Sequence, residues 1–250
     1  MNKVIAVTTM SKQYYDTCGK YAIQTFQKYW KNIILHVYRE DTFEVPGNLS
    51  NIIFHSVDEL NNGYFEFIKR NHNNRIKTFS IKAFVLLKAL ETLPCDYLIW
   101  HDADLITKKE VTPEFFKDLC KNNLIVYNGI DYVWDKKDGK GKRIFHSCDS
   151  GFFILNNKVS SIETLAKRYK QYYIEEITDN LKRFYDNDVL GNVIIELEKE
   201  GIKTLDLNKS SRDRFSPMNM KSNFLQPFFT HFKGGKKEFK PLKDLVSPYL

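Results

Sequence analysis

Hydrophobic and polar positions alternate along this chain in blocks that predict strands and helices in turn. Short apolar runs with a two-residue period predict strands at Lys3–Thr9, Ile33–Tyr38, Asn51–Ser56, Tyr97–Trp100, Leu124–Tyr127 and Gly151–Leu155. Apolar residues at helical spacing predict helices at Thr78–Leu93, Glu114–Leu119, Val159–Glu176 and Val189–Glu200, and a further one that places Cys18, Ala22, Thr25, Phe26 and Tyr29 on one face. This alternation favours an α/β/α sandwich with a mainly parallel sheet. We expect a single domain over residues 1–250.

Two acidic residues stand where the strand beginning at Tyr97 ends. In the stretch YLIWHDADLIT, four apolar residues run into His-Asp-Ala-Asp, which contains Asp102 and Asp104. Open α/β sheets bind ligands beyond the carboxyl ends of their strands, and uncompensated carboxylates there would be costly. About one D-x-D triplet is expected by chance in a chain of this size, so the triplet alone carries little weight. Its position after a buried strand favours a hard divalent cation such as Mn²⁺ or Mg²⁺.

Charge and cysteine content narrow the class of protein. The net charge is +7, with basic residues concentrated at Lys136–Arg143 and after Gly201. Such clusters are either solvated faces or the footprint of a polyanionic ligand. The four cysteines contain no C-x-x-C pair, which argues against a zinc knuckle or a disulfide framework. With no apolar run of about 18 residues and no signal-peptide pattern, we expect a protein of the cytoplasm, bacterial or of a virus-infected cell.

Four short motifs follow one another along the chain. They are WHDADLI with Asp102 and Asp104, DSGFFILN with Asp149, Ser150, Gly151 and Asn156, DNDVLGN with Asp186, Asn187, Asp188 and Asn192, and HFKGGKK from His231 to Lys237. In this order they resemble the GT-A glycosyltransferases, most closely their glycogenin and bacterial galactosyltransferase-like branch. Tyr29-Trp30 and Val37–Asp41 also resemble the opening of phage-encoded glycosyltransferases.

This chain departs from the pattern of that branch at three places. Asp149 stands where the branch has Asn, Lys82 stands where it usually has Arg, and no Pro-Trp follows Lys237. Lysine keeps a positive charge at its position but lacks the planar, bidentate recognition that arginine offers.

The resemblance implies a metal-dependent transfer of a sugar from a nucleotide diphosphate, with UDP-glucose or UDP-galactose as the expected donor. Asp104 would bind Mn²⁺ or Mg²⁺, Asp102 would share the metal or bind the donor ribose, and His231 would complete the protein ligands. The donor-binding residues implied are Thr8, Thr9, Lys82, Asp102, Lys233, Gly234 and Lys237. Ordinary structural roles are alternatives: Thr8 and Thr9 could close a strand, Lys82 could lie on a solvated helix face, and His231 could be a structural histidine.

Asp186 and Asp188 are the acids that remain for chemistry at the anomeric carbon. Glycosyl transfer passes through an oxocarbenium-like state, so a nearby carboxylate can stabilise positive charge or deprotonate the acceptor hydroxyl. The resemblance favours Asp188 as the sugar-binding acid, and it implies acceptor or sugar contacts for Asp149, Ser150 and Gly151. The alternative is that Asp186 or Asn187 caps the helix Val189–Glu200. Retention or inversion of configuration stays open.

The acceptor is the least constrained part of the prediction. Trp134–Arg143 reads as a Gly- and Lys-rich loop, with Trp134 and Phe145 as possible stacking platforms beside a polyanion. The acceptor is then either a hydroxymethylated DNA base or a cell-surface or lipid-linked glycan. Two other functions compete with glycosyl transfer. One is a non-catalytic nucleic-acid-binding protein, and the other is a Mg²⁺-dependent nucleotidyltransferase, which would also use paired carboxylates.

Overall fold

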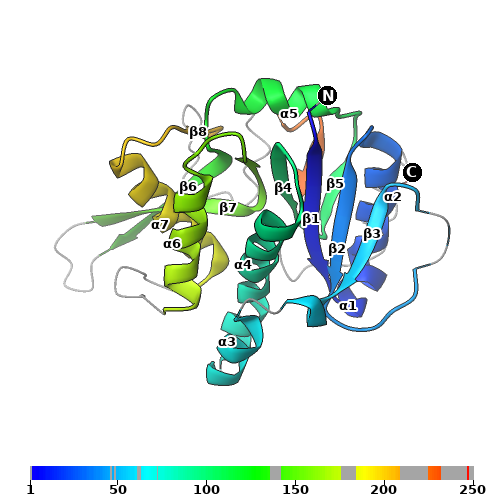
Figure 1. Ribbon diagram of the computed structural model, residues 1–250, viewed down its shortest axis with the longest axis horizontal. Helices are drawn as coiled ribbons and strands as arrows, with labels where there is room; N and C mark the ends of the chain where they lie inside the picture. Colours follow the sequence, from blue (N-terminus) through cyan, green and yellow to red (C-terminus); the bar gives the residue numbers. More distant parts are fainter. Residues whose placement is uncertain are drawn as a thin grey trace.

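A computed structural model describes residues 2–45, 47, 49–60, 63–71, 73–135, 142–175, 184–208, 225–231 and 247, with the backbone alone at 74–75, 131–135 and 142–146. Figure 1 shows a central sheet whose strands are covered by helices on both sides. Among the described residues, no helix combines the length and apolar character that crossing a bilayer requires.

Seven strands form the central sheet in the order β3-β2-β1-β4-β7-β6-β8. Their bounds are β1 Val4–Met10, β2 Ile34–Arg39, β3 Ile52–Ser56, β4 Tyr97–His101, β6 Ile125–Asp135, β7 Lys142–Asn156 and β8 Thr204–Asp206. Of these strands, β7 runs antiparallel to both its neighbours, and the other pairs are parallel. A second, two-stranded sheet pairs β5, Leu105–Thr107, with β9, Phe229–His231. The mainly parallel sheet confirms the predicted α/β class.

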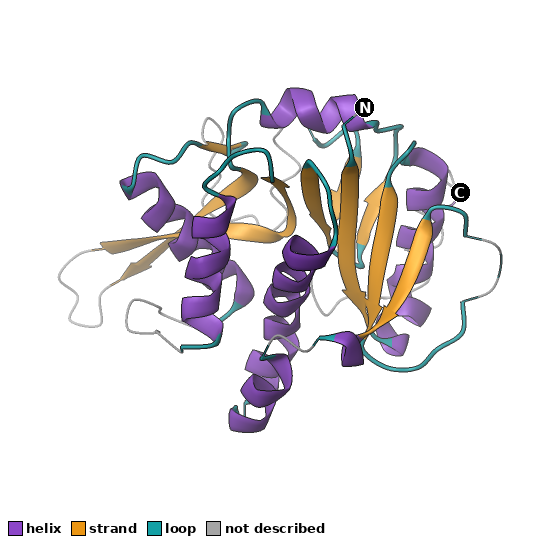
Figure 2. Cartoon of the chain, viewed as in Figure 1, coloured by secondary structure: helices purple, strands orange, loops and turns teal. Residues whose placement is uncertain are grey.

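Helices cover both faces of the large sheet (Figure 2). Their bounds are α1 Lys12–Tyr14, the π-helical turn η1 Tyr15–Gly19, α2 Lys20–Tyr29, the 3-10 turn η2 Val57–Glu59, α3 Tyr64–Arg70, α4 Asn74–Thr92, α5 Pro113–Cys120, α6 Ile162–Tyr173 and α7 Asp186–Lys199. The buried side chains of α4, α6 and α7 join one apolar cluster, and those of α2 and α5 join another on the opposite face. The sheet therefore lies between two helical layers.

Strand β1 is apolar at each of its first four positions, Val4 to Val7. Ile5 and Val7 pack into the cluster with α4, whereas Val4 and Ala6 pack into the cluster with α2. Because successive side chains of a strand point to opposite faces, a central strand covered on both sides must be apolar throughout. The same two-sided burial applies to β4, all of whose residues are buried.

Several helix boundaries differ from those expected from the sequence. Helix α4 begins at Asn74, four residues before the expected Thr78, and α7 begins at Asp186, three residues before Val189. These first turns are mostly polar, with Ile76 as the one apolar residue before Thr78 and Val189, so hydrophobic spacing did not mark them. Helix α6 spans Ile162–Tyr173 rather than Val159–Glu176, and Glu176 lies outside the described residues. In α5, Pro113 occupies the first turn as predicted, and the hydroxyl of Thr112 accepts a hydrogen bond from Phe115 N–H.

The predicted bounds of the loop Trp134–Arg143 are wrong at both ends, because these ends belong to strands. Strand β6 continues to Asp135 and β7 starts at Lys142, with Trp134 opposite Arg143 in an antiparallel hairpin. Residues 136–141 lie outside the described part of the chain. The ends of the two strands include the polar residues Asp135, Lys142 and Arg143, so no apolar alternation predicted a strand there. Backbone pairing between two strands does not require apolar side chains.

Candidate active site

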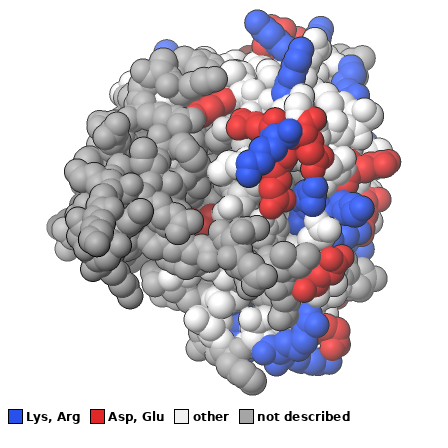
Figure 3. All heavy atoms as spheres, turned by 90° about the vertical axis from the view of Figure 1, so that its left-hand side faces the viewer, with Lys and Arg blue, Asp and Glu red and all other residues white. Residues whose placement is uncertain are grey.

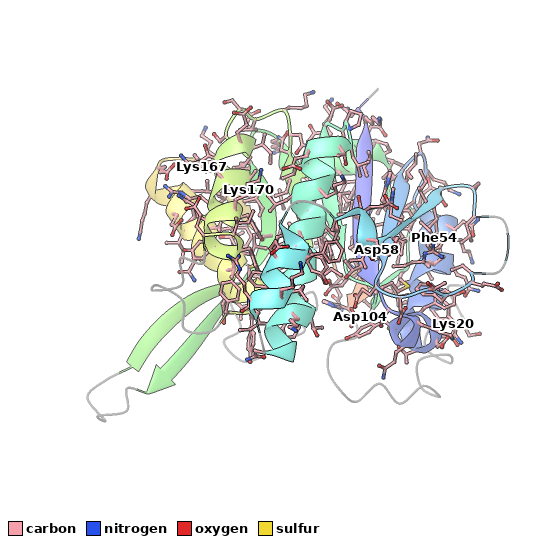
Figure 4. All side chains as sticks on the ribbon, turned by 60° about the horizontal axis from the view of Figure 1, so that its bottom comes forward. Lys20, Phe54, Asp58, Asp104, Lys167 and Lys170 are labelled. Atoms are coloured by element: carbon pink, nitrogen blue, oxygen red, sulfur yellow. The ribbon has the colours of Figure 1, made fainter. Side chains whose placement is uncertain are left out.

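The paired acids lie where β4 ends, at the carboxyl edge of the parallel strands. The backbone turns sharply after His101, with Leu105 N–H donating to the carbonyl of Asp102 at 3.0 Å. Asp102 N–H donates to the carbonyl of Gly151 on β7 at 2.9 Å, which fixes the turn against the neighbouring strand. Figure 4 shows Asp104 at the end of the sheet, far from Lys167 and Lys170 on α6.

His231 reaches this turn through the small second sheet. Strands β5 and β9 pair antiparallel with Leu105 opposite His231, so the histidine stands beside the residue that follows Asp104. Its Nε2 lies 3.0 Å from Asp104 Oδ1 and 3.4 Å from Asp102 Oδ2. The structure therefore brings together the three residues that the sequence predicts as metal ligands.

The donor atoms of Asp102, Asp104 and His231 suit a divalent cation. One ligand atom from each residue lies within 4.8 Å of the others. Both ring nitrogens of His231 are buried and, among the described residues, neither makes a hydrogen bond of acceptable geometry. Two carboxylate oxygens and an imidazole nitrogen converge here, and these are ligand types that divalent cations such as Mn²⁺ accept.

Electrostatics and sterics hold the His231 ring in this place. Burial lowers the pKa of His231, but the carboxylates of Asp104 and Asp149 outweigh burial, and the pKa lies well above its usual value. Gly151 is required next to the ring, because a Cβ at this position would overlap the His231 Cε1 atom. Any larger residue at 151 would displace the imidazole.

Lys82 connects the metal corner to the start of α7. Its ammonium lies 3.0 Å from Asp102 Oδ1 and 2.8 Å from Asp186 Oδ2, and it donates to the carbonyl of Ser150 at 2.8 Å. Burial lowers the pKa of Lys82, yet Asp102 and Asp186 raise it above its usual value. Lys82 lies within α4, Asn74–Thr92. Its side chain is 12% exposed, so a position on a solvated helix face is wrong.

Trp100 is a site residue that the sequence reasoning missed. Its indole Nε1 donates to Asp102 Oδ1 at 2.5 Å, and its ring lies 4.9 Å from the Lys82 ammonium. Trp100 and Lys82 both contact Asp102 Oδ1, and the other oxygen, Oδ2, lies toward His231. No local signal marked Trp100, because a tryptophan within an apolar strand is normally a core residue.

Asp186 and Asp188 lie in the first turn of α7, both buried. Ser150 donates to Asp186 Oδ2 at 2.6 Å, and Ser147 donates to Asp188 Oδ1 at 3.2 Å. The alternative role as helix cap is wrong, because the cap is Tyr185, which makes no side-chain capping bond to the described residues. Both acids therefore face β7 at the same end of the sheet as Asp102.

The predicted sugar contacts occupy β7 next to the metal corner. Asp149, Ser150 and Gly151 are all buried, and Asp149 Oδ1 accepts the Gly151 N–H at 2.9 Å. Asn156, the last residue of the same motif, lies at the other end of β7, opposite Tyr97. There its amide donates to the carbonyl of Lys121, so it has a structural role.

The remaining donor-binding candidates divide into two groups. Thr8 is buried and Thr9 is partly buried in β1, which continues to Met10, one residue beyond the expected end. The Thr8 hydroxyl donates to the carbonyl of Thr9 at 3.3 Å. The predicted diphosphate contacts Lys233, Gly234 and Lys237 lie outside the described residues.

Known proteins resemble this chain in structure rather than in sequence. No protein-family profile matches the chain, and no curated protein matches its sequence. The galactosyltransferase LgtC, solved with donor and acceptor sugar analogues, aligns over 98% of this chain and 95% of its own at 17% identity, with a TM-score of 0.56. The bifunctional glycosyltransferase WbbM aligns over 98% of this chain and 50% of its own at 13% identity, with a TM-score of 0.59.

A eukaryotic enzyme shares the same architecture. Mouse xyloside xylosyltransferase 1 aligns over 82% of this chain and 84% of its own at 13% identity, with a TM-score of 0.52. These similarities confirm the predicted fold: the chain has the α/β fold of the GT-A glycosyltransferases, with its Asp-Asp-His corner at the carboxyl end of β4.

Proposed function

We propose that this protein is a metal-dependent glycosyltransferase that moves a hexose from a UDP-sugar to an acceptor hydroxyl. The observation that carries the proposal is the convergence of Asp102, Asp104 and His231 within 4.8 Å. Two of these residues end a parallel strand, where α/β sheets bind ligands, and the third comes from a distant part of the chain. The fold shared with several glycosyltransferases supports the same conclusion.

Asp102, Asp104 and His231 would hold Mn²⁺ or Mg²⁺. A bound cation supplies Lewis-acid stabilisation of the charge that develops on a diphosphate leaving group. Trp100 and Lys82 hold Asp102 Oδ1, which leaves the second oxygen of this carboxylate toward His231. Lys233, Gly234 and Lys237 are proposed to bind the diphosphate, with Thr8 and Thr9 near the base and ribose.

The acids at the start of α7 are proposed to act on the sugar. Asp188 would lie near the reacting face, where a carboxylate stabilises positive charge at the anomeric carbon. Asp186 shares Lys82 with Asp102, so the sugar-side and metal-side carboxylates are joined by one cation. The positive charge of the single buried Lys82 therefore reduces the repulsion between the two acids.

We propose a glycan hydroxyl as the acceptor. The LgtC structure contains an acceptor sugar analogue in the same fold, which supports a sugar as acceptor. A hydroxymethylated DNA base is the second candidate, favoured by the net charge of +7. Figure 3, however, shows basic and acidic side chains interleaved over the described part of one face. Among the described ion pairs between helices, Arg168 of α6 pairs with Glu196 and Glu200, and Lys170 of α6 pairs with Glu91 of α4.

Donor hydrolysis tests the proposal without knowledge of the acceptor. The purified protein is incubated with Mn²⁺ and a panel of UDP-, GDP- and TDP-hexoses, and released nucleotide is measured. We expect slow hydrolysis of a UDP-hexose that stops on chelation of the metal and in Asp104→Ala. Asp118→Asn, an exposed acid on α5, serves as the matched control and should hydrolyse the donor normally.

The result distinguishes this function from its two competitors. A nucleic-acid-binding protein would release no nucleotide and would bind DNA equally well after Asp104→Ala. A nucleotidyltransferase would release pyrophosphate from a nucleoside triphosphate instead of a nucleotide from a UDP-sugar. Turnover that survives Asp104→Ala would remove the metal corner from the mechanism.

A further inference from the structure

Asp149 on β7 is a fully buried carboxylate behind the metal corner. Its exposed fraction is 0%, and its Oδ1 accepts the Gly151 N–H at 2.9 Å. Its Oδ2 lies 3.6 Å from Nδ1 of His231. Burying a carboxylate is costly unless a positive or N–H-bearing group faces it. The imidazole of His231 is such a group.

The His231 ring lies between two sets of acids. Nδ1 faces Asp149, and Nε2 faces Asp104 and Asp102 on the opposite side of the ring. An imidazole that binds a cation through Nε2 uses the lone pair of that nitrogen, so its proton is on Nδ1. Asp149 is the carboxylate that faces this Nδ1–H, whereas Asp102 and Asp104 face Nε2.

The ring has little freedom to turn away from this orientation. It occupies the space where a side chain at position 151 would begin, and its side chain is 2% exposed. The residue that leaves this space open, Gly151, also donates its N–H to Asp149. One short segment of β7 therefore provides both the space for the imidazole and the carboxylate behind it.

We propose that Asp149 is a positioning residue, which keeps the proton of His231 on Nδ1 so that Nε2 is presented to a divalent cation. It acts through His231 and does not contact the sugar. This inference rests on the proposed metal-dependent function. Partners of this kind behind a metal-binding histidine change metal affinity by about 10- to 100-fold when they are removed.

Asp149→Asn is the variant that tests the proposal. Asparagine has nearly the same shape and keeps an oxygen for the Gly151 N–H, but it removes the charge that faces Nδ1. Calorimetric titration with Mn²⁺ should show an affinity about 10- to 100-fold lower than that of the unmodified protein. Asp96→Asn is the matched control, since Asp96 accepts the Lys3 N–H just before β4 begins, away from the metal corner. It should leave Mn²⁺ affinity unchanged.

A second measurement reads the histidine directly and needs no metal. Nitrogen-15 NMR, at a pH where the His231 ring is neutral, measures the share of the Nδ1–H form, which Asp149 favours, against the Nε2–H form, which Asp102 and Asp104 favour. The share of the Nδ1–H form should be larger in the unmodified protein than in Asp149→Asn. A purely structural role would lower the unfolding temperature but leave the tautomer unchanged.

The two measurements separate failure of this inference from failure of the proposed function. An Asp149→Asn variant with an unchanged share of the Nδ1–H form and unchanged Mn²⁺ affinity overturns the role of Asp149. A smaller share of the Nδ1–H form in Asp149→Asn, in a protein that binds no Mn²⁺, instead supports the contact and overturns the metal-dependent function.

Discussion

Lys82 illustrates at the scale of single residues how charges are balanced in this site. Its ammonium is 12% exposed and lies within 3.0 Å of an oxygen from each of Asp102 and Asp186. Either carboxylate would be costly at this depth without a compensating cation. One lysine thus makes two partly buried acids compatible with folding.

Removal of this charge should be strongly destabilising. Lys82→Met keeps the length and apolar stem of the side chain but leaves Asp102 and Asp186 without their shared cation. We expect the free energy of unfolding in urea to fall by about 3–5 kcal/mol, since breaking a buried ion pair strands its partners. Lys69→Met, which breaks the exposed pair with Glu66, should cost less than about 1 kcal/mol. Equal losses in the two variants would contradict the structural role of Lys82.

Gly151 and Gly19 make a second comparison between single residues. A Cβ at Gly151 would meet the His231 ring, whereas a Cβ at Gly19 would meet the flexible end of Met10. Gly151→Ala should therefore cost about 1–3 kcal/mol by overpacking and lower Mn²⁺ affinity at least about tenfold. Gly19→Ala should stay within about 1 kcal/mol of the unmodified protein, because the methionine can move. Urea unfolding and Mn²⁺ titration of both variants check this; intact Mn²⁺ binding in Gly151→Ala would be the contrary result.

The individual site residues were predictable to different degrees. Asp102, Asp104 and His231 belong to motifs with a recognisable order, and the structure brings them together. Trp100 was not recognised, since a tryptophan in an apolar strand reads as core unless its hydrogen bond is known. The partners of Lys82 were equally hidden, because they come from β7, α7 and the turn after β4, and no local pattern links these segments.

At the scale of elements, strands with apolar runs were predictable and those without were not. β1, β2, β3 and β4 lie within about a residue of their expected positions, because each contains a run of apolar residues. In β1 and β4, burial on both faces requires that run. β5 and β9 have three residues each, and their pairing joins segments far apart in the chain. Such short strands are stabilised by tertiary contacts rather than by a pattern of their own, so only the fold reveals that β9 delivers His231.

The outer strands β2 and β3 carry a histidine pair whose protonation should affect stability. His36 Nδ1 lies 2.9 Å from His55 Nε2, and His55 Nδ1 lies 3.0 Å from Glu59 Oε2. Burial lowers the pKa of His36 to about 4, with His55 and Lys3 adding to the effect. In the unfolded chain the pKa returns to about 6.5. Between these two values the unfolded state binds more protons, so stability should fall as the pH drops from about 6.5 to about 4.

His36→Phe should reduce this pH dependence. The unmodified protein should lose up to about 3 kcal/mol of unfolding free energy through His36 over this pH range, and the variant should lose correspondingly less. Urea unfolding at pH 7, 5.5 and 4.5 measures the difference in slope between the two proteins. The buried His101, whose pKa is also lowered to about 4, remains in both and cancels in the comparison. Parallel slopes would show that His36 already binds its proton in the folded protein.

At the scale of the whole molecule, a bound cation would join two distant parts of the chain. Asp102 and Asp104 follow β4 in the central sheet, whereas His231 ends β9 in the small sheet. Any ligand that binds the folded state and not the unfolded chain raises stability, by about 2.7 kcal/mol at a concentration 100 times its Kd. For a chain of this size that corresponds to a rise in Tm of roughly 5–10 °C.

Thermal unfolding with and without Mn²⁺ measures this coupling directly. The rise in Tm should disappear on addition of EDTA and in His231→Gln, which lacks the imidazole although Asp102 and Asp104 remain. Asp118→Asn should keep the full rise, because Asp118 lies outside the metal site. A general effect of the cation on surface acids would instead raise the Tm of His231→Gln as well. A Tm that rises equally in His231→Gln would mean that the cation binds without β9, and the small sheet would then have no part in forming the metal site.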